Sequence, residues 1–241
     1  AEKRNSARLD LARFYISRGM AADALGILEV ALEQAPAIGS DTGFIALRAA
    51  AHYLLGKYAT AAPDFEHVHL KNDPSVAPWR AGIASAKGDW LAAYKLIRDS
   101  RGIVASFPKW LKTRFQMIGA EAALAAKDTD SAKLWLDALG SSSLSDTDSQ
   151  YLKFLNGHAL RLQGKPSAAK SLWRDVVENG DRRARAKAAF ALVNADIETN
   201  QTDRKKAIEA LEALSFAWRG DAFEFDLKRR LGDLHADEGE Y

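Results

Sequence analysis

Apolar residues recur at helical spacing along most of this chain. In "ALGILEVAL" and "AIEALEAL" they stand at i, i+3, i+4 and i+7, which is the period of an amphipathic helix. Such stretches come in pairs joined by short turns, and no alternating strand pattern competes with them over any long stretch. The pattern therefore predicts an all-α protein built from helix pairs.

The first pair contains an order of residues that returns along the chain. In "LARFYISRGMAADALGILEVALEQAP", residues 11–36, a turn glycine is followed by an alanine and then by a large apolar residue. The equivalent turn positions are Gly19, Gly56, Gly88, Lys127, Gly164, Thr202 and Gly239. They lie 37, 32, 39, 37, 38 and 37 residues apart, and a period in the thirties is typical of two-helix repeat arrays. The approximate repeats are 5–38, 42–74, 75–107, 112–142, 147–180, 183–216 and, in part, 222–241.

Small residues stand at regular places within each pair. Two helices approach closely only where small side chains occupy the crossing point. We therefore expect Ala12 to face Ala24 within the first pair, and Ala31 to face the next pair. Between pairs lie loops with turn residues, and in one of them Ser145 followed by Asp148 predicts a helix N-cap with an acidic first turn.

Composition narrows the possible functions. The 241 residues include no cysteine, which excludes disulfides, thiolate metal sites and a cysteine nucleophile. The formal net charge of +2 gives no support to nucleic-acid binding. No apolar run approaches the roughly 20 residues that cross a bilayer, so no membrane insertion is expected within this segment. The alanine-rich, cysteine-free composition favours a bacterial protein, in the periplasm or tethered to a membrane rather than in the cytoplasm.

No local motif supplies a catalytic site. A nucleophile needs a base and an orienting group, and none stand together here, so we expect no enzymatic activity, no cofactor and no metal. His67 and His69, placed on a predicted helix, would point about 200° apart and could not share a metal ion. Basic runs stand at 182–187, 204–206 and 228–230, and they form either solvated helix faces or a basic strip for an acidic partner.

The repeated pattern resembles the tetratricopeptide repeat. The residues that match its motif in order are Leu11, Ala12, Tyr15, Gly19, Ala24, Leu28, Ala31 and Pro36. Gly88-Asp89-Trp90 and Gly239-Glu240-Tyr241 are similar to the turn of that motif, and Leu231-Gly232 to its first-helix pair. The resemblance covers about six repeats and a partial seventh, and another type of α-solenoid is the alternative.

The resemblance implies a right-handed superhelical α-solenoid of stacked antiparallel helix pairs, forming a single domain over residues 1–241. Because the sequence stops where a second helix should begin, we expect a fragment of a longer protein; alternatively, the last helix is itself the cap.

In this family, the first helix of each pair lines a concave groove that binds a peptide or a partner helix. Counting from the motif, the groove candidates are Arg13, Tyr53, Arg114, Glu121, His158, Arg161, Asp196, Arg229 and Asp233. The Lys, Asn and Arg set with which some members grip a C-terminal carboxylate is not present, so binding of chaperone tails is disfavoured.

Three functions follow as expectations. The first is a non-catalytic scaffold that binds a protein or peptide in the groove. The second is a structural segment that assembles with itself or within a larger complex, which includes a homo-oligomer. The third is a regulatory domain of an enzyme whose catalytic part is not in this chain.

Overall fold

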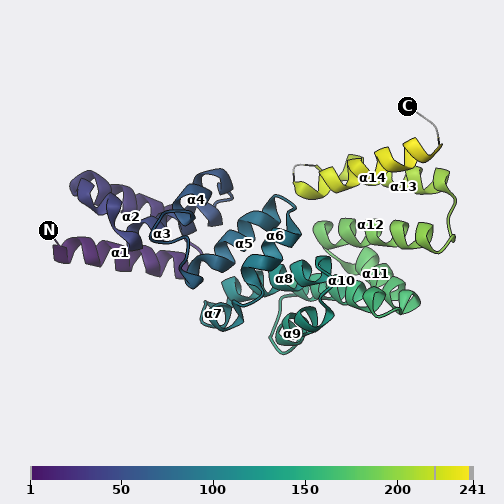
Figure 1. Ribbon diagram of the computed structural model, residues 1–241, viewed down its shortest axis with the longest axis horizontal. Coiled ribbons are helices and arrows are strands. Elements are labelled where there is room, and N and C mark those ends of the chain that lie inside the picture. Colours follow the sequence, from purple (N-terminus) through teal and green to yellow (C-terminus); the bar gives the residue numbers. More distant parts are fainter. Residues whose placement is uncertain (1, 220, 239–241) are drawn as a thin grey trace. The chain divides into compact units, whose positions relative to one another are not determined.

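The protein is all-helical in the part of the chain that the structure describes. The computed structural model describes residues 2–219 and 221–238, which contain 14 α-helices and no strand (Figure 1). Helices account for 80% of the structure. The prediction of an all-α protein is confirmed.

The helices are short to medium in length and follow one another closely. They are α1 (Glu2–Ser17), α2 (Ala21–Gln34), α3 (Thr42–Leu54), α4 (Tyr58–Phe65), α5 (Ala77–Ala86), α6 (Trp90–Ile97), α7 (Arg101–Ala105), α8 (Lys109–Ala125), α9 (Thr129–Gly140), α10 (Asp146–Leu162), α11 (Pro166–Asn179), α12 (Arg182–Glu198), α13 (Arg204–Ala217) and α14 (Ala222–Glu238). Two 3₁₀ turns, Pro36–Ser40 and Pro74–Val76, precede α3 and α5. The sequence pattern did not predict α7, a five-residue helix in the loop before α8.

The chain divides into two compact units, Ala1–Ile118 and Gly119–Tyr241, with the boundary inside α8. In the first unit α1 packs on α2, α3 on α4, and α5 on α6. In the second unit α10 packs on α11 and α12 on α13. Alternate helices also touch, namely α1 with α3, α3 with α5, and α10 with α12. Each unit is thus a stack of helix pairs.

Six left-handed turns join the helices of the pairs. Gly19, Gly56, Gly88, Lys127, Gly164 and Asn200 have φ between 52° and 78°. In each turn this residue donates its N–H to the carbonyl three residues earlier, and the next residue donates to the carbonyl five residues earlier, at 2.8–3.1 Å. This is the Schellman arrangement, which ends a helix and satisfies its last carbonyls. One local structure therefore recurs in every pair.

Five of the predicted turn positions are confirmed, including Lys127, and one is wrong. Asn200 rather than Thr202 takes the left-handed conformation, which asparagine adopts more readily than most residues. In the other turns the N-cap of the second helix follows the left-handed residue directly, as Asp89 follows Gly88, whereas Asp203 caps α13 three residues after Asn200. The longer linker explains the error of two residues. Gly239 lies outside the described residues.

Helix starts follow the expected capping chemistry. The Ser145 hydroxyl accepts the Asp148 N–H at 3.1 Å, as the sequence predicts. Aspartates cap further helices in the same way, each accepting an N–H three residues later: Asp41, Asp89, Asp128, Asp181 and Asp203.

The core of the first unit combines small crossing residues with an aromatic cluster. Ala12, Ala24 and Ala31 are fully buried, in line with their predicted place at helix contacts. The aromatic rings of Tyr53, Phe65, Trp79, Phe107 and Phe115 pack with centroids 5.2–6.1 Å apart. At the start of α8, Trp110 donates its indole N–H to the Ser17 carbonyl at 2.9 Å and lies over Gly19.

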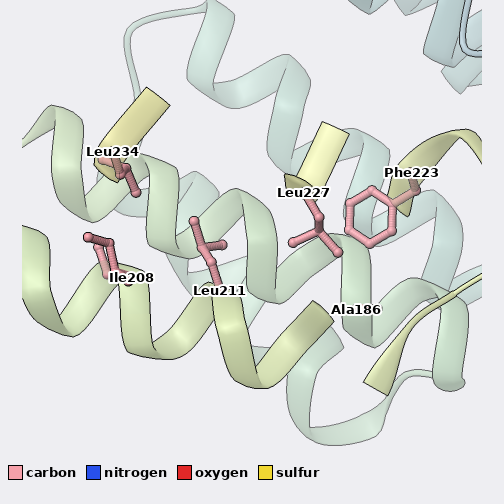
Figure 2. Close-up of a cluster of buried hydrophobic side chains, with 7 residues drawn as sticks. Ala186, Ile208, Leu211, Phe223, Leu227 and Leu234 are labelled. Carbon is pink, nitrogen blue, oxygen red and sulfur yellow. The ribbon is translucent and has the colours of Figure 1, made fainter. Parts of the chain in front are cut away.

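The second unit seats tryptophans on glycines. Trp173 of α11 lies on Gly157 of α10, and Trp135 of α9 lies on Gly119 of α8, so closely that a Cβ on either glycine would clash. Figure 2 shows the last core cluster, in which residues of α12, α13 and α14 meet. Its members are Ala186, Ala207, Ile208, Leu211, Phe223, Leu227 and Leu234.

Candidate functional site

A buried polar network joins three first helices of the second unit. Glu121 comes from α8, Tyr151 from α10 and Lys187 from α12. The Tyr151 hydroxyl donates to Glu121 Oε2 at 2.6 Å, and Lys187 Nζ donates to Glu121 Oε1 at 2.5 Å and to the Tyr151 hydroxyl at 2.9 Å. Glu121 and Lys187 are 66 residues apart in sequence. We call these three residues the Glu121 network.

The network keeps its carboxylate and its ammonium charged. Burial works to raise the pKa of Glu121, but the positive charge of Lys187 and the hydrogen bonds from Lys187 and Tyr151 outweigh it, so this pKa lies below its usual range. Burial works to lower the pKa of Lys187, and the negative charge of Glu121 raises it further than burial lowers it. Burial together with the Glu121 charge raises the pKa of Tyr151 to about 12. All three groups are therefore locked in one protonation state around neutral pH.

Aromatic and basic side chains surround the network. His158 lies edge-on to Phe154, with ring centroids 4.7 Å apart, and 5.0 Å from Trp173. Burial lowers the pKa of His158 to about 4, so the ring is neutral at physiological pH. The Arg183 guanidinium stacks over the Tyr151 ring at 5.2 Å. Arg183 itself is exposed, and it brings a cation to the rim of the network.

The last helix adds a carboxyl group near the network. Burial raises the pKa of Asp226 of α14, while Arg229 and Lys187 work against that rise. Asp226 accepts a hydrogen bond from Arg229 at 3.0 Å.

Chemically, the Glu121 network is a compensated ion pair rather than an activated group. The raised pKa values of Lys187 and Tyr151 keep the amine and the hydroxyl protonated, so neither is in the form of a nucleophile, and the Glu121 carboxylate is neutralised by Lys187. Its effect is to hold α8, α10 and α12 in one register, because an unpaired buried charge would be costly.

A second buried lysine ties α11 to the turn that follows α12. Lys170 donates to Thr199 Oγ1 at 2.7 Å and to Gln201 Oε1 at 2.8 Å, and it forms an ion pair with Asp196 at 2.7 Å. The side chain of Lys170 lines a pocket of about 220 Å³ with Pro166, Ser167, Arg174, Thr199 and Gln201. Since the three donors of the ammonium already have partners, this lysine serves packing first.

The structure brings together three of the nine groove candidates. Glu121 and Arg161 each lie close enough to His158 for their charge to influence the pKa of its ring. Arg161 is exposed and pairs with Glu198 at 3.2 Å. Glu198 stands at the last position of α12 and Arg183 near its start, about 22 Å away along the helix, so Arg161 does not share the rim with Arg183.

Other candidates have different surroundings. Tyr53 lies in the aromatic core with only 1% of its surface exposed, where burial raises its pKa to about 12. Arg114 stacks on that ring at 4.8 Å, so both residues contribute to packing. Asp196 faces Lys170 of α11.

The remaining three candidates are exposed. Arg13 pairs with Asp10, and Arg229 pairs with Asp226, each three residues away on its own helix. Asp233 of α14 is exposed to solvent.

Sequence reasoning missed Tyr151 and the burial of Lys187, and it placed Lys187 and Arg183 only within the basic run 182–187. A register signal could have found the first two, because Tyr151 stands 13 residues before Gly164 and Lys187 stands 13 residues before Asn200. That is two helical turns before the position of His158 in its own repeat.

The basic run at 182–187 does not form one basic strip. Arg182 donates to the last carbonyl of α13, at Ala217, and Arg185 donates to the Gly180 carbonyl. Lys187 is buried.

The expectation for His67 and His69 rested on a wrong geometry. The helix ends at Phe65, so both residues lie beyond it, and their rings are 5.4 Å apart. Among the described residues, no group of three or more His, Asp or Glu side chains is placed to hold a metal ion.

No helix within the described ranges is long and apolar enough to span a bilayer.

The fold and the network define the class of this protein as an all-helical protein of repeat-like helix pairs. The sequence matches no model of a known protein family, and it matches no curated protein.

Proposed function

We propose that this protein is a non-catalytic scaffold of the tetratricopeptide type. In this proposal the helix pairs stack into a right-handed superhelical α-solenoid, and the inner face of the first helices binds a peptide or a partner protein. Arrays of helix pairs present an extended surface that suits this task.

The observation that carries the proposal concerns two adjacent positions in the first helix of each pair. The residue type is nearly constant at one position and differs from repeat to repeat at the other. Seven residues before the left-handed turn residue, five of the six described repeats carry a buried alanine or glycine, and the sixth carries a half-buried valine. These residues are Ala12, Ala49, Ala81, Ala120, Gly157 and Val193. One residue later the same frame carries six different side chains: Arg13, Ala50, Gly82, Glu121, His158 and Asn194. A fixed frame with a variable neighbour suits a repeat scaffold that recognises a particular partner, although only some repeats offer this neighbour to solvent: Arg13 is exposed, whereas Ala50 and Gly82 are buried.

The charge at the rim of the Glu121 network indicates the kind of partner. Glu121 and Lys187 neutralise each other, while Arg183 remains exposed over the Tyr151 ring. Arg161, farther along α10 and also exposed, pairs with Glu198 at 3.2 Å. Guanidinium groups bind carboxylates through two parallel hydrogen bonds. We therefore propose that the partner segment is acidic.

The experiment is selection of peptides from a displayed random library on the whole protein, followed by titration of the selected peptides. We expect acidic peptides whose affinity falls at least about tenfold in Arg183→Glu and in Arg161→Glu. Lys133→Glu is the matched control, since Lys133 is an exposed cation of α9, a second helix. Circular dichroism of each variant separates lost binding from lost folding.

Two results would overturn the proposal. One is that no peptide is enriched over an unrelated helical protein. The other is that selected peptides bind the two arginine variants as tightly as they bind wild type, which would place the binding surface elsewhere.

A further inference from the structure

The loop that follows α4 brings two histidines together. The His67 carbonyl accepts the Leu70 N–H at 2.8 Å, so residues 67–70 form a hydrogen-bonded turn that contains His69. The His67 ring folds over this turn, with its Nδ1 3.5 Å from the His69 N–H nitrogen. The two imidazole rings therefore lie side by side, with centroids 5.4 Å apart and planes tilted by 56°.

The loop is fixed to the body of the first unit. Leu70 is buried with 2% of its surface exposed. Arg80 of α5 donates to Glu66 Oε1 at 2.7 Å and to the Lys71 carbonyl at 2.9 Å, and so holds both ends of the segment that carries the histidines. The rings thus stand on a preorganised backbone, which reduces the entropy that a ligand must remove on binding.

The spacing of the two rings fits two ligands of one metal ion. A histidine nitrogen stands about 2.0–2.1 Å from a bound zinc, so two imidazoles on a tetrahedral ion have centroids about 5.2 Å apart. The rings of His67 and His69 are 5.4 Å apart, and both reach solvent, since His69 is exposed and His67 half-buried. The hydrogen bond to His67 Nδ1 is long at 3.5 Å, so little is lost when a ring nitrogen turns to a metal.

The nearest carboxylates have partners of their own. Asp64 accepts two hydrogen bonds from the Arg48 guanidinium, at 2.8 and 2.7 Å, and Glu66 accepts one from Arg80. The protein ligands are therefore the two imidazoles, and water fills the other positions. Imidazole nitrogens suit Cu²⁺, Ni²⁺ and Zn²⁺, whereas Mg²⁺ and Ca²⁺ take oxygen ligands.

We infer that His67 and His69 form a binding site for one divalent transition-metal ion of the copper, nickel or zinc type, to which each ring gives one nitrogen. Binding by the second ring is intramolecular, which raises the affinity above that of a single surface histidine. The inference is independent of the scaffold proposal, because these histidines belong to the first unit and Arg183 belongs to the second.

Calorimetric titration of Cu²⁺ into the whole protein tests the inference, since Cu²⁺ binds a given nitrogen site most tightly among these ions. We expect one strong site per chain, with a dissociation constant that rises at least about tenfold in His67→Ala and in His69→Ala. The matched control is His235→Ala, which removes a half-buried histidine of α14 and should leave this constant unchanged. Circular dichroism shows whether each variant keeps its helices.

NMR spectroscopy of the histidine rings identifies the ligands separately. Because Cu²⁺ is paramagnetic, a substoichiometric amount should broaden the ring signals of His67 and His69 before those of the other three histidines, His52, His158 and His235.

Four results would overturn the inference. The first is the absence of a strong Cu²⁺ site, and the second is an unchanged dissociation constant in both loop variants, which would place the ion elsewhere. The third is a loss of affinity in only one of them, which would indicate a single-histidine site. The fourth is equal broadening of all five rings.

Discussion

Lys187 of α12 and Glu121 of α8 form a 2.5 Å ion pair across 66 residues of sequence, and Tyr151 of α10 hydrogen-bonds to both. Removing one member of a buried pair leaves the other charge without compensation. We therefore predict that Lys187→Met destabilises the protein by about 3–5 kcal/mol. Urea unfolding followed by circular dichroism measures this change.

The exposed pair between Lys133 and Asp137, 3.9 Å apart, provides the control. Lys133→Met should change the free energy of unfolding by less than about 1 kcal/mol. The double variant Glu121→Gln/Lys187→Met should be more stable than Lys187→Met alone, because it no longer buries an unpaired charge. Equal stabilities of the single and double variants would contradict the ion-pair account.

The lowered pKa of His158 predicts that the free energy of unfolding decreases as the pH falls below neutral. Its pKa is about 4 in the folded protein, because the ring is buried, against about 6.5 when unfolded. Since the folded pKa is the lower one, the unfolded state takes up the proton first as pH falls. The stability from neutral His158 is therefore complete above about pH 6.5 and is lost as pH falls towards 4.

The measurement is the unfolding free energy as a function of pH for wild type and for His158→Gln. The variant should show a smaller slope between pH 6.5 and 4. NMR titration of the ring should give a midpoint well below the usual value, and a midpoint near 6.5 would show that the ring is not held neutral.

Two of the left-handed turn residues are not glycine, and they offer a test of the repeated turn. An ordinary side chain in this conformation costs about 1–2 kcal/mol. We predict that Lys127→Gly, at φ 58°, raises the free energy of unfolding by about 1 kcal/mol, and that Asn200→Gly raises it less, because asparagine tolerates the conformation. Gly164→Ala should lower stability by a similar amount. Thermal unfolding of the three variants would reveal opposite shifts, and a destabilised Lys127→Gly would refute the turn assignment.

The close packing of Trp173 on Gly157 predicts that the α10–α11 contact tolerates no side chain larger than glycine at position 157. A Cβ on Gly157 would stand 2.2 Å from Trp173 Nε1, so Gly157→Ala should destabilise by about 1–3 kcal/mol through overpacking. The hydrogen bond of 3.0 Å from Trp173 Nε1 to the Phe154 carbonyl should weaken with it. Gly140→Ala in α9 is the matched control, because its Cβ would meet open space. Equal effects of the two changes on chemical unfolding would contradict the packing.

Local features of the fold could be predicted from the sequence because they depend on nearby residues. Glycine marks most left-handed turns, and serine or aspartate marks the N-caps, whatever the rest of the chain does. Thr202 was misplaced because the polar stretch around it offers several residues that suit a turn. The short helix α7 was missed because five residues carry too little periodicity to stand out.

The candidate site was harder to predict, since it depends on which residues of distant helices meet. Glu121, His158 and Arg161 were predicted as groove residues from their places in the repeat, and that role stays a prediction. Tyr53 stands at an equivalent inner position, yet the aromatic rings of Trp79 and Phe115 enclose it. In the sequence, Lys187 stands among other basic residues and therefore resembles a surface residue. Its partner Glu121 lies 66 residues away, so no neighbouring residue indicates that Lys187 is buried in an ion pair. Burial of a charge is decided by such long-range pairs.

The most direct test of the scaffold proposal is calorimetric titration of a selected acidic peptide into wild type, Arg183→Glu and Lys133→Glu. The account predicts an affinity that falls at least about tenfold in Arg183→Glu and stays at the wild-type value in Lys133→Glu. The same affinity for all three proteins would contradict it.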